Sequence, residues 1–276
     1  LVRYKKRQVE HVASEKNRLI RILEDANIKL STVLTDVHGA TGIKIINDII
    51  DGKSNVDDLM KHIHGKVKAN REDIRKALEG RLTPHHRFML SIIKKSIEEK
   101  EAIIRELEQH IDQATAQYAV EIDLLQTIDG VGKDSAISII SEIGVDMDQF
   151  PNEHHLSSWA GVSPGNHESA GKKKSVKTVK GNRYLKSLLA ECAWGATRKK
   201  DGYLKRKYQS LVARRGKKKA LVAVGHKIII AAYHILKNKE PYKEPPLHNS
   251  VERNKKQIKR HLAKLKELGY DLISAA

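Results

Sequence analysis

The feature that most constrains this chain is a stretch from Thr83 to about Ala119 in which aliphatic residues recur every three or four positions. This spacing puts them on one face of an α-helix. Thr83-Pro84 suits the start of that helix, because Thr is a favoured N-cap and Pro is tolerated in the first turn. The interleaved charges predict a coiled-coil-like hairpin with an amphipathic helix at residues 1–30, or with a second copy of the chain. A plain helical bundle is the alternative.

Composition favours helices packed on helices. Apolar residues make up 39% of the 276 positions but aromatic residues only 4%, so the core must be built from Leu, Ile, Val and Ala. We therefore expect an all-α (mainly α) fold. A long coiled-coil-like helical arm should span residues 1–119. A compact helical domain containing a helix-hairpin-helix should span 120–245, and a tail helix should lie within 246–276.

The charge of the chain is large and concentrated. Its formal net charge is +18 and its sequence pI is about 9.8. Residues 172–219 contain eighteen Lys and Arg against two acids, Glu191 and Asp201, and so carry +16 of that charge. A basic surface of this density predicts a polyanionic partner, DNA above all, that meets this part of the chain.

Residues 124–136 read as two helices joined by a tight Gly-x-Gly turn, LLQTIDGVGKDSA. This is the pattern of a helix-hairpin-helix, in which glycines let backbone N–H groups approach a phosphate at the start of the second helix. We expect Gly130, Gly132 and Lys133 to lie at such a contact. With the basic window, the candidate nucleic-acid-binding residues are Gly130, Gly132, Lys133, Lys172, Lys173, Lys174, Lys177, Lys180, Asn182, Arg183, Arg214, Arg215, Lys217 and Lys218.

A Gly/Pro-punctuated loop, WAGVSPGNHESAGKKKSVKTVKG, at residues 159–181 leads into the basic window. Ser169 is at the centre of this loop, followed by a small-residue turn and three lysines. A serine hydroxyl attacks a phosphodiester once a neighbour takes its proton, and nearby cations stabilise the charge that develops on phosphate oxygens. The commoner role of a Ser-Ala-Gly segment is a simple turn, so these residues alone leave both interpretations open.

A metal site is not expected within this chain. Its fourteen histidines include adjacent pairs, whose side chains point apart, and they lack the spacing of zinc ligands. The single cysteine, Cys192, excludes an intramolecular disulfide and is most simply a small core residue. No signal peptide or membrane-spanning run is evident, which predicts no membrane partner.

Three segments together resemble a known family: IDGVGKDSAISIISEIG, then FPNEHHLSSWAGVSPGNHESAGKKKSVKTVKGNRYLKSLLAECAW, then ARRGKKKALVAVGHKIIIAAYHIL. They are similar to the C-terminal domain of the DEDD-type insertion-sequence transposases, relatives of the Piv invertases, some of which are guided by a bridge RNA. The resemblance covers about Leu124 to Tyr242, and LEGRLTPHHRFML resembles the family's coiled-coil region.

The resemblance implies a role in DNA transposition or site-specific recombination with Ser169 as the catalytic nucleophile, forming a phosphoserine link to DNA. This chain has Ser-Ala-Gly where many members have Ser-Gly, so Ser163 and Ser175 are the alternatives. The family's N-terminal RuvC-like domain supplies four acidic residues that bind Mg²⁺. We expect this chain to be a truncated member without that domain, which binds DNA but does not cleave it alone.

The resemblance further implies a structured guide RNA, a homo-oligomer (dimer or tetramer) and a prokaryotic, cytoplasmic, nucleoid-associated location. The competing hypothesis is a non-catalytic nucleic-acid-binding module, because a basic helical surface and a hairpin need no chemistry.

Overall fold

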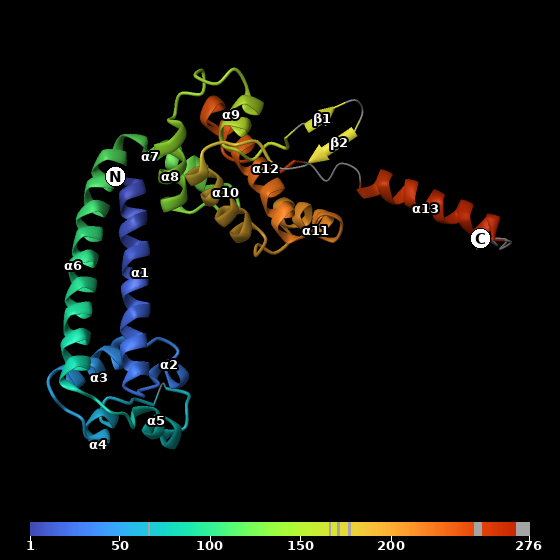
Figure 1. Ribbon diagram of the computed structural model, residues 1–276. Coiled ribbons are helices and arrows are strands. Elements are labelled where there is room, and N and C mark those ends of the chain that lie inside the picture. Colours follow the sequence, from blue (N-terminus) through green and yellow to red (C-terminus); the bar gives the residue numbers. More distant parts are fainter. Residues whose placement is uncertain (66, 166, 170–171, 176–177, 246–249, 269–276) are drawn as a thin grey trace. The chain divides into compact units, whose positions relative to one another are not determined.

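The computed structural model describes residues 1–276 except 66, 166, 170–171, 176–177, 246–249 and 269–276. The chain divides into two compact units, an N-terminal unit (Leu1–Gln117) and a C-terminal unit (Tyr118–Ala276). Most of the described residues are helical (Figure 1), which confirms the predicted mainly α fold. Two short strands, β1 (His167–Ser169) and β2 (Lys172–Ser175), lie where the sequence predicted only a loop.

The N-terminal unit is built on two long helices, α1 (Val2–Asp25) and α6 (Pro84–Thr115). They run side by side in opposite directions (Figure 1). The Lys5 Nζ lies 3.0 Å from Glu108 Oε1 and the Lys16 Nζ 2.9 Å from Glu101 Oε1, so residue numbers rise along one helix as they fall along the other. The long helix predicted from Thr83 onward therefore pairs with the first helix of the same chain.

The start of α6 is fixed by its capping residues. The Thr83 hydroxyl accepts a hydrogen bond from the His86 backbone N–H, and the Thr83 backbone N–H donates to His86 Nδ1 at 3.2 Å. Because Nδ1 accepts, the His86 ring proton is on Nε2, which lies 3.0 Å from the Asp25 carboxylate at the end of α1. This bond joins the end of one long helix to the start of the other.

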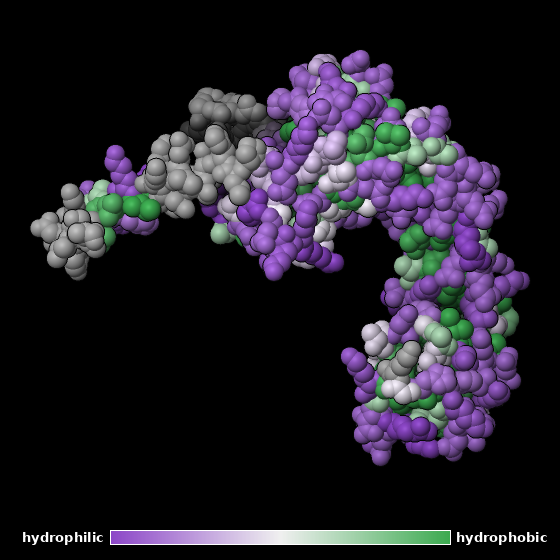
Figure 2. All heavy atoms as spheres, turned by 180° about the vertical axis from the view of Figure 1, so that it is seen from behind, coloured by the Kyte–Doolittle hydropathy of each residue, from purple (hydrophilic) through white to green (hydrophobic). Residues whose placement is uncertain are grey.

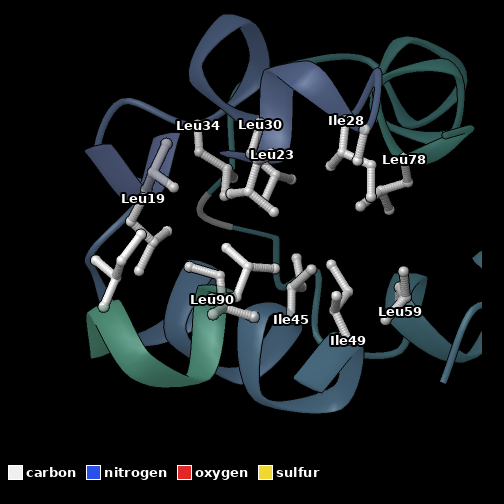
Figure 3. Close-up of a cluster of buried hydrophobic side chains, with 14 of the residues drawn as sticks. Leu19, Leu23, Ile28, Leu30, Leu34, Ile45, Ile49, Leu59, Leu78 and Leu90 are labelled. Atoms are coloured by element: carbon white, nitrogen blue, oxygen red, sulfur yellow. The ribbon is translucent and has the colours of Figure 1, made fainter. Parts of the chain in front are cut away.

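Four short helices close one end of this pair: α2 (Leu30–Val33), α3 (Ala40–Ile50), α4 (Val56–Met60) and α5 (Arg71–Leu78). Their aliphatic side chains point toward one another and toward those of α1 and α6 (Figure 3). Ile45, Ile49 and Leu59 are completely buried, as is Leu90 of α6. The predicted arm therefore carries a compact head with a hydrophobic core, which the long-range periodicity alone did not reveal.

The C-terminal unit packs shorter helices around α12 (Lys217–Asn238). The helices of this unit before α12 are α7 (Ala119–Gln126), α8 (Lys133–Ile143), α9 (Glu153–Trp159), α10 (Arg183–Ala196) and α11 (Tyr203–Arg215); a 3-10 turn, η1 (Ala116–Tyr118), precedes α7. Helix α12 contacts α7, α9, α10 and α11, and α8 contacts α7 and α10. A last helix, α13 (Ser250–Glu267), follows.

Helix α12 is long and apolar enough to cross a membrane by length and composition, the single described helix that is. Half of its apolar window is buried against the rest of the structure. Val224, Ile228 and Ile229 are fully covered by neighbouring helices. A core helix passes the same test, so this is weak evidence for a membrane span.

Candidate nucleic-acid interface

The predicted Gly-x-Gly turn joins α7 to α8, and its two glycines differ. Gly130 has φ +83°, and a Cβ added there would lie 2.2 Å from the Cys192 carbonyl oxygen of α10. Gly132 is the N-cap of α8 with φ −94°, and no atom would lie within 4 Å of its Cβ. Only Gly130 therefore needs glycine for both conformation and space. Gly132 and Lys133 are exposed at the start of α8.

A buried carboxylate, that of Asp129, joins the same turn to Lys199. The Asp129 side chain is 6% exposed, and its Oδ1 lies 2.5 Å from the Lys199 Nζ just after α10. Its other oxygen, Oδ2, is buried without a hydrogen-bond partner. The hydrogen bond that the Lys199 ammonium group donates to Asp129 raises the pKa of that group. Sequence reasoning missed this pair, because the two residues are seventy positions apart.

The strands β1 and β2 form an antiparallel ribbon between α9 and α10. At its base, Gly161 has φ +72°, and a Cβ on Gly181 would lie 2.4 Å from the Gly161 nitrogen. The Asn182 backbone N–H donates to the Trp159 carbonyl at 2.9 Å. These contacts hold the two ends of the segment together, and the ribbon extends away from the helices (Figure 1).

Ser169 is the last residue of β1 and pairs with Lys172 of β2, while Glu168 pairs with Lys173. Ser175, one of the two alternative candidates for the nucleophile, pairs with His167. The structure describes the backbone of Ser169, Lys172, Lys173, Lys174 and Ser175; their side chains, and all of Lys177, lie outside the described part. The strand register thus brings the predicted nucleophile opposite the first of the three lysines.

Ser163, the other alternative candidate for the nucleophile, lies at the base of the ribbon rather than in either strand. Its hydroxyl oxygen is 2.8 Å from that of the fully buried Ser157, which donates in turn to the His154 carbonyl at 3.0 Å. Ser163 itself is only partly exposed. This hydroxyl is therefore engaged in holding α9 to the ribbon base.

Asn182 and Arg183 begin α10. The Asn182 side-chain oxygen accepts from the backbone N–H groups of Tyr184 and Leu185, and its amide donates to Glu142 at the end of α8. The structure thus gives Asn182 a capping and bridging role. Arg183 is exposed, with its guanidinium carbon 4.9 Å from the centre of the Tyr184 ring. Lys180, just before them, is exposed as well.

A second basic group lies where α11 meets α12. Arg214 and Arg215 end α11, Gly216 follows with φ +78°, and lysines occupy positions 217–219 in the first turn of α12. All five cations are exposed. The first turn of α12 carries no acid, so its positive charge adds to the positive end of the helix dipole instead of offsetting it. Hydrophilic residues cover most of the face drawn in Figure 2.

Residues 239–245, here called the strap, follow α12 and contact α7 and its C-cap residue, Thr127. Lys239 Nζ lies 2.9 Å from Glu121 Oε1 of α7, which lowers the pKa of Glu121. The Tyr242 backbone N–H donates to the Thr127 hydroxyl at 2.7 Å. Burial, with nearby negative charge, raises the pKa of Tyr242 to about 12. No local sequence pattern predicts these contacts, because they join residues more than a hundred positions apart.

No group of three or more His, Cys, Asp or Glu side chains among the described residues is arranged to hold a metal ion. The described part of the chain therefore does not fit the acidic Mg²⁺ site that the family resemblance implies.

Residues 122–209 match the family model described as Transposase IS116/IS110/IS902 family. The matched range contains the α7–α8 turn, the ribbon, all of α10 and the first half of α11. The match to that family model is confined to this segment, which is less than half of the chain.

Two curated relatives show what proteins this chain is similar to. It is 29% identical over 170 residues to the transposase for insertion sequence element IS1111A of Coxiella burnetii (strain RSA 493 / Nine Mile phase I), which covers 59% of this chain and 45% of the relative. It is 28% identical over 134 residues to the pilin gene-inverting protein of Moraxella lacunata, covering 46% of this chain and 40% of the relative. These matches span less than half the length of either relative.

Proposed function

We propose that this chain is the nucleic-acid-binding and serine-bearing part of a protein that transposes or recombines DNA. The observation that carries the proposal is the coincidence between the transposase family match and the interface. Residues 122–209 include the hairpin turn, the ribbon with Ser169 and the start of α10. The named relatives, a transposase and a pilin gene-inverting protein, support the same class of function.

The DNA backbone would bind to the exposed cations of residues 172–219. The start of α12 suits a phosphate better than the start of α8, because α8 has the exposed Asp134 in its first turn whereas α12 has three lysines and no acid there. A negative side chain at a helix start competes with an anionic ligand for the same N–H groups and dipole. We therefore assign the main phosphate contact to the α11–α12 junction and a weaker one to the hairpin.

In the chemical step, the Ser169 Oγ attacks a DNA phosphorus and forms a phosphoserine ester as the bond from phosphorus to one deoxyribose oxygen breaks. The serine proton passes to a base, and the leaving oxygen takes up a proton. The ester conserves the energy of the broken bond, so a second DNA hydroxyl can reseal the strand. The placement of Ser169 in the projecting ribbon supports this role, and the hydrogen bond of Ser163 at the ribbon base argues against that alternative.

Mg²⁺, a structured guide RNA and a homo-oligomer remain proposals that rest on the family resemblance. Mg²⁺ would neutralise charge on the reacting phosphate; its ligands would be acidic residues other than those described. The described residues of this chain would bind and orient DNA around the ribbon.

The binding part of the proposal is tested by measuring the affinity of the chain for duplex DNA across a salt series. Phosphate binding releases condensed cations, so the affinity should fall steeply, by about 0.9 logarithmic units per phosphate contact for each tenfold rise in salt. An affinity that stays flat from low to physiological salt would contradict it.

The chemical part is tested by trapping a covalent protein–DNA adduct in a chain extended to the length of its relatives. Ser169→Ala should abolish the adduct but leave duplex binding nearly unchanged, because one hydroxyl contributes little to phosphate contacts. Ser163→Ala is the matched control and should retain the adduct. If an adduct survives Ser169→Ala and disappears in Ser163→Ala or Ser175→Ala, the nucleophile is a different serine. If binding occurs but no adduct ever forms, the chain is a non-catalytic binding module.

A further inference from the structure

The chain has two tryptophans, and both are unusually exposed for the largest apolar side chain. Trp194 of α10 is 47% exposed and Trp159 of α9 is 42% exposed. The Trp159 ring packs with its edge against Phe150, with ring centres 6.0 Å apart. Trp194 instead has a cation beside it, since the Arg198 guanidinium carbon lies 5.8 Å from its ring centre.

Helix α10, which carries Trp194, packs against the turn between α7 and α8. A Cβ on the following residue, Gly195, would lie 3.4 Å from the Gly130 Cα, and the Gly130 position approaches the carbonyl of Cys192 and the nitrogen of Ala196. The turn of α10 that carries Trp194 is therefore in backbone contact with the turn that joins α7 to α8.

The surroundings of Trp194 are cationic. Arg198, Lys199 and Lys200 follow it within two turns of chain, and all three are exposed. The Lys199 ammonium is held in place by the buried Asp129 carboxylate at 2.5 Å. A protein partner would be expected to meet an apolar patch depleted of charge at its centre. An aromatic ring beside three cations fits a nucleotide better, because each nucleotide combines a flat base with a phosphate.

We propose that Trp194 is a stacking platform for an unpaired base of a DNA strand, and that Arg198 and Lys199 bind the phosphates next to that base. This inference rests on the proposed nucleic-acid binding and makes it more specific. Bases inside a duplex present only their edges in the grooves, whereas an unpaired base offers a free face to an aromatic ring. Trp194 would therefore select DNA whose strands are single or locally opened.

The two tryptophans make the test direct, because replacing one leaves the other as the single indole emitter. Trp159→Phe leaves Trp194, whose emission should be quenched by a 20-nucleotide oligothymidylate and change little with a fully paired 20-base-pair duplex. Trp194→Phe leaves Trp159, whose emission should change much less with the same oligothymidylate.

Binding provides an independent measurement. Trp194→Ala should weaken oligothymidylate binding about tenfold, the order expected for loss of one base–aromatic stack, while duplex affinity stays within about twofold. Trp194→Phe keeps a smaller ring and should lose less affinity, which guards against a folding defect in the alanine variant.

The possible outcomes separate this inference from the proposed function. Salt-dependent duplex binding with an unquenched Trp194 and an unchanged oligothymidylate affinity in Trp194→Ala would overturn the stacking role alone. No binding of either nucleic acid would overturn both proposals.

Discussion

In the N-terminal unit, lysines of α1 pair with glutamates of α6, whereas the cations of the C-terminal unit gather in residues 172–219, where eighteen stand against two acids. The first arrangement uses charge to set the register of two helices. The second leaves far more positive charge than its own acids can neutralise. The contrast teaches that in this chain the balance of charge within a segment, more than the number of charged residues, separates scaffold from interface.

The packing of the two units offers two different ways to lose stability. The head of the N-terminal unit is filled by branched aliphatic side chains (Figure 3), and its helices are kept apart by them. In the C-terminal unit, glycines bring backbones into direct contact, at Gly130 with α10 and at Gly161 with Gly181. Close glycine contacts also occur in the N-terminal unit, where a Cβ on Gly42 would lie 1.9 Å from the Val37 carbonyl oxygen. The substitutions below therefore test a steric clash in one unit and a lost volume in the other.

The largest effect is expected for Gly130→Val. The new side chain would collide with the Cys192 carbonyl and hold a β-branched residue at φ +83°, so we expect the C-terminal unit to lose at least about 3 kcal/mol of stability or fail to fold. Gly132→Val meets open space at an ordinary φ and should cost about 1 kcal/mol as a poorer N-cap. Because both tryptophans are in this unit, their fluorescence during denaturation measures it selectively. Equal losses of stability in the two variants would contradict the conclusion that Gly130, but not Gly132, must be glycine.

A cavity in the N-terminal unit should have the next largest effect. Leu90→Ala removes a completely buried side chain from the head core and should cost about 2–5 kcal/mol. Ile92→Ala, two residues along the same helix and 48% exposed, should change stability by less than about 0.5 kcal/mol. The loss should appear in the helical circular dichroism signal, with the tryptophan transition unmoved. A shift of both signals together would show that the units unfold as one.

Charge removal should have a moderate effect on binding and little on folding. Replacing the three lysines at 217–219 with Gln should weaken duplex DNA binding about tenfold or more and reduce its salt dependence, because fewer condensed cations are released. The matched control replaces Lys53, Lys61 and Lys95, exposed lysines of the N-terminal unit that pair with nearby acids. That triple variant should bind within about twofold of the parent. Equal losses would mean that the interface extends over both units.

The smallest effect concerns acid sensitivity. Burial lowers the pKa of His226 on α12, with Lys227 and His154 adding to the shift. The unfolded chain therefore binds this proton more readily than the folded one, so the contribution of His226 to stability is present above about pH 6.5 and is lost as the pH falls through its folded pKa. His226→Gln should make the tryptophan-detected stability fall less steeply as the pH drops below about 6.5. The exposed His85→Gln should leave the profile unchanged.

The elements that were predicted best are those that depend on residues close together along the chain. The long helix from Thr83 carries its own cap and apolar repeat, and it begins where that pattern indicates. The ribbon was missed, because segments such as HES and KKKS have neither β-branched residues nor alternating polarity. Its ends are joined instead by the Gly161–Gly181 approach.

Within the candidate site, the glycines were recognised as a pair but not told apart, since the difference lies in α10, about sixty residues away. The Asp129–Lys199 pair and the strap depend on still longer separations. The exposure of Trp194, by contrast, follows from the apolar repeat of α10, because Leu185, Leu189, Cys192 and Ala196 lie on the opposite face of that helix.

The first turn of α12 has a thermodynamic consequence for the free protein. Three adjacent lysines repel one another and the positive end of their own helix, so the helix start is electrostatically strained until an anion arrives. Bound DNA would relieve that strain and be linked to folding, so that ligand affinity and resistance to heat rise together. A bound polyanion would thus stabilise the first turn of a helix that already forms without it.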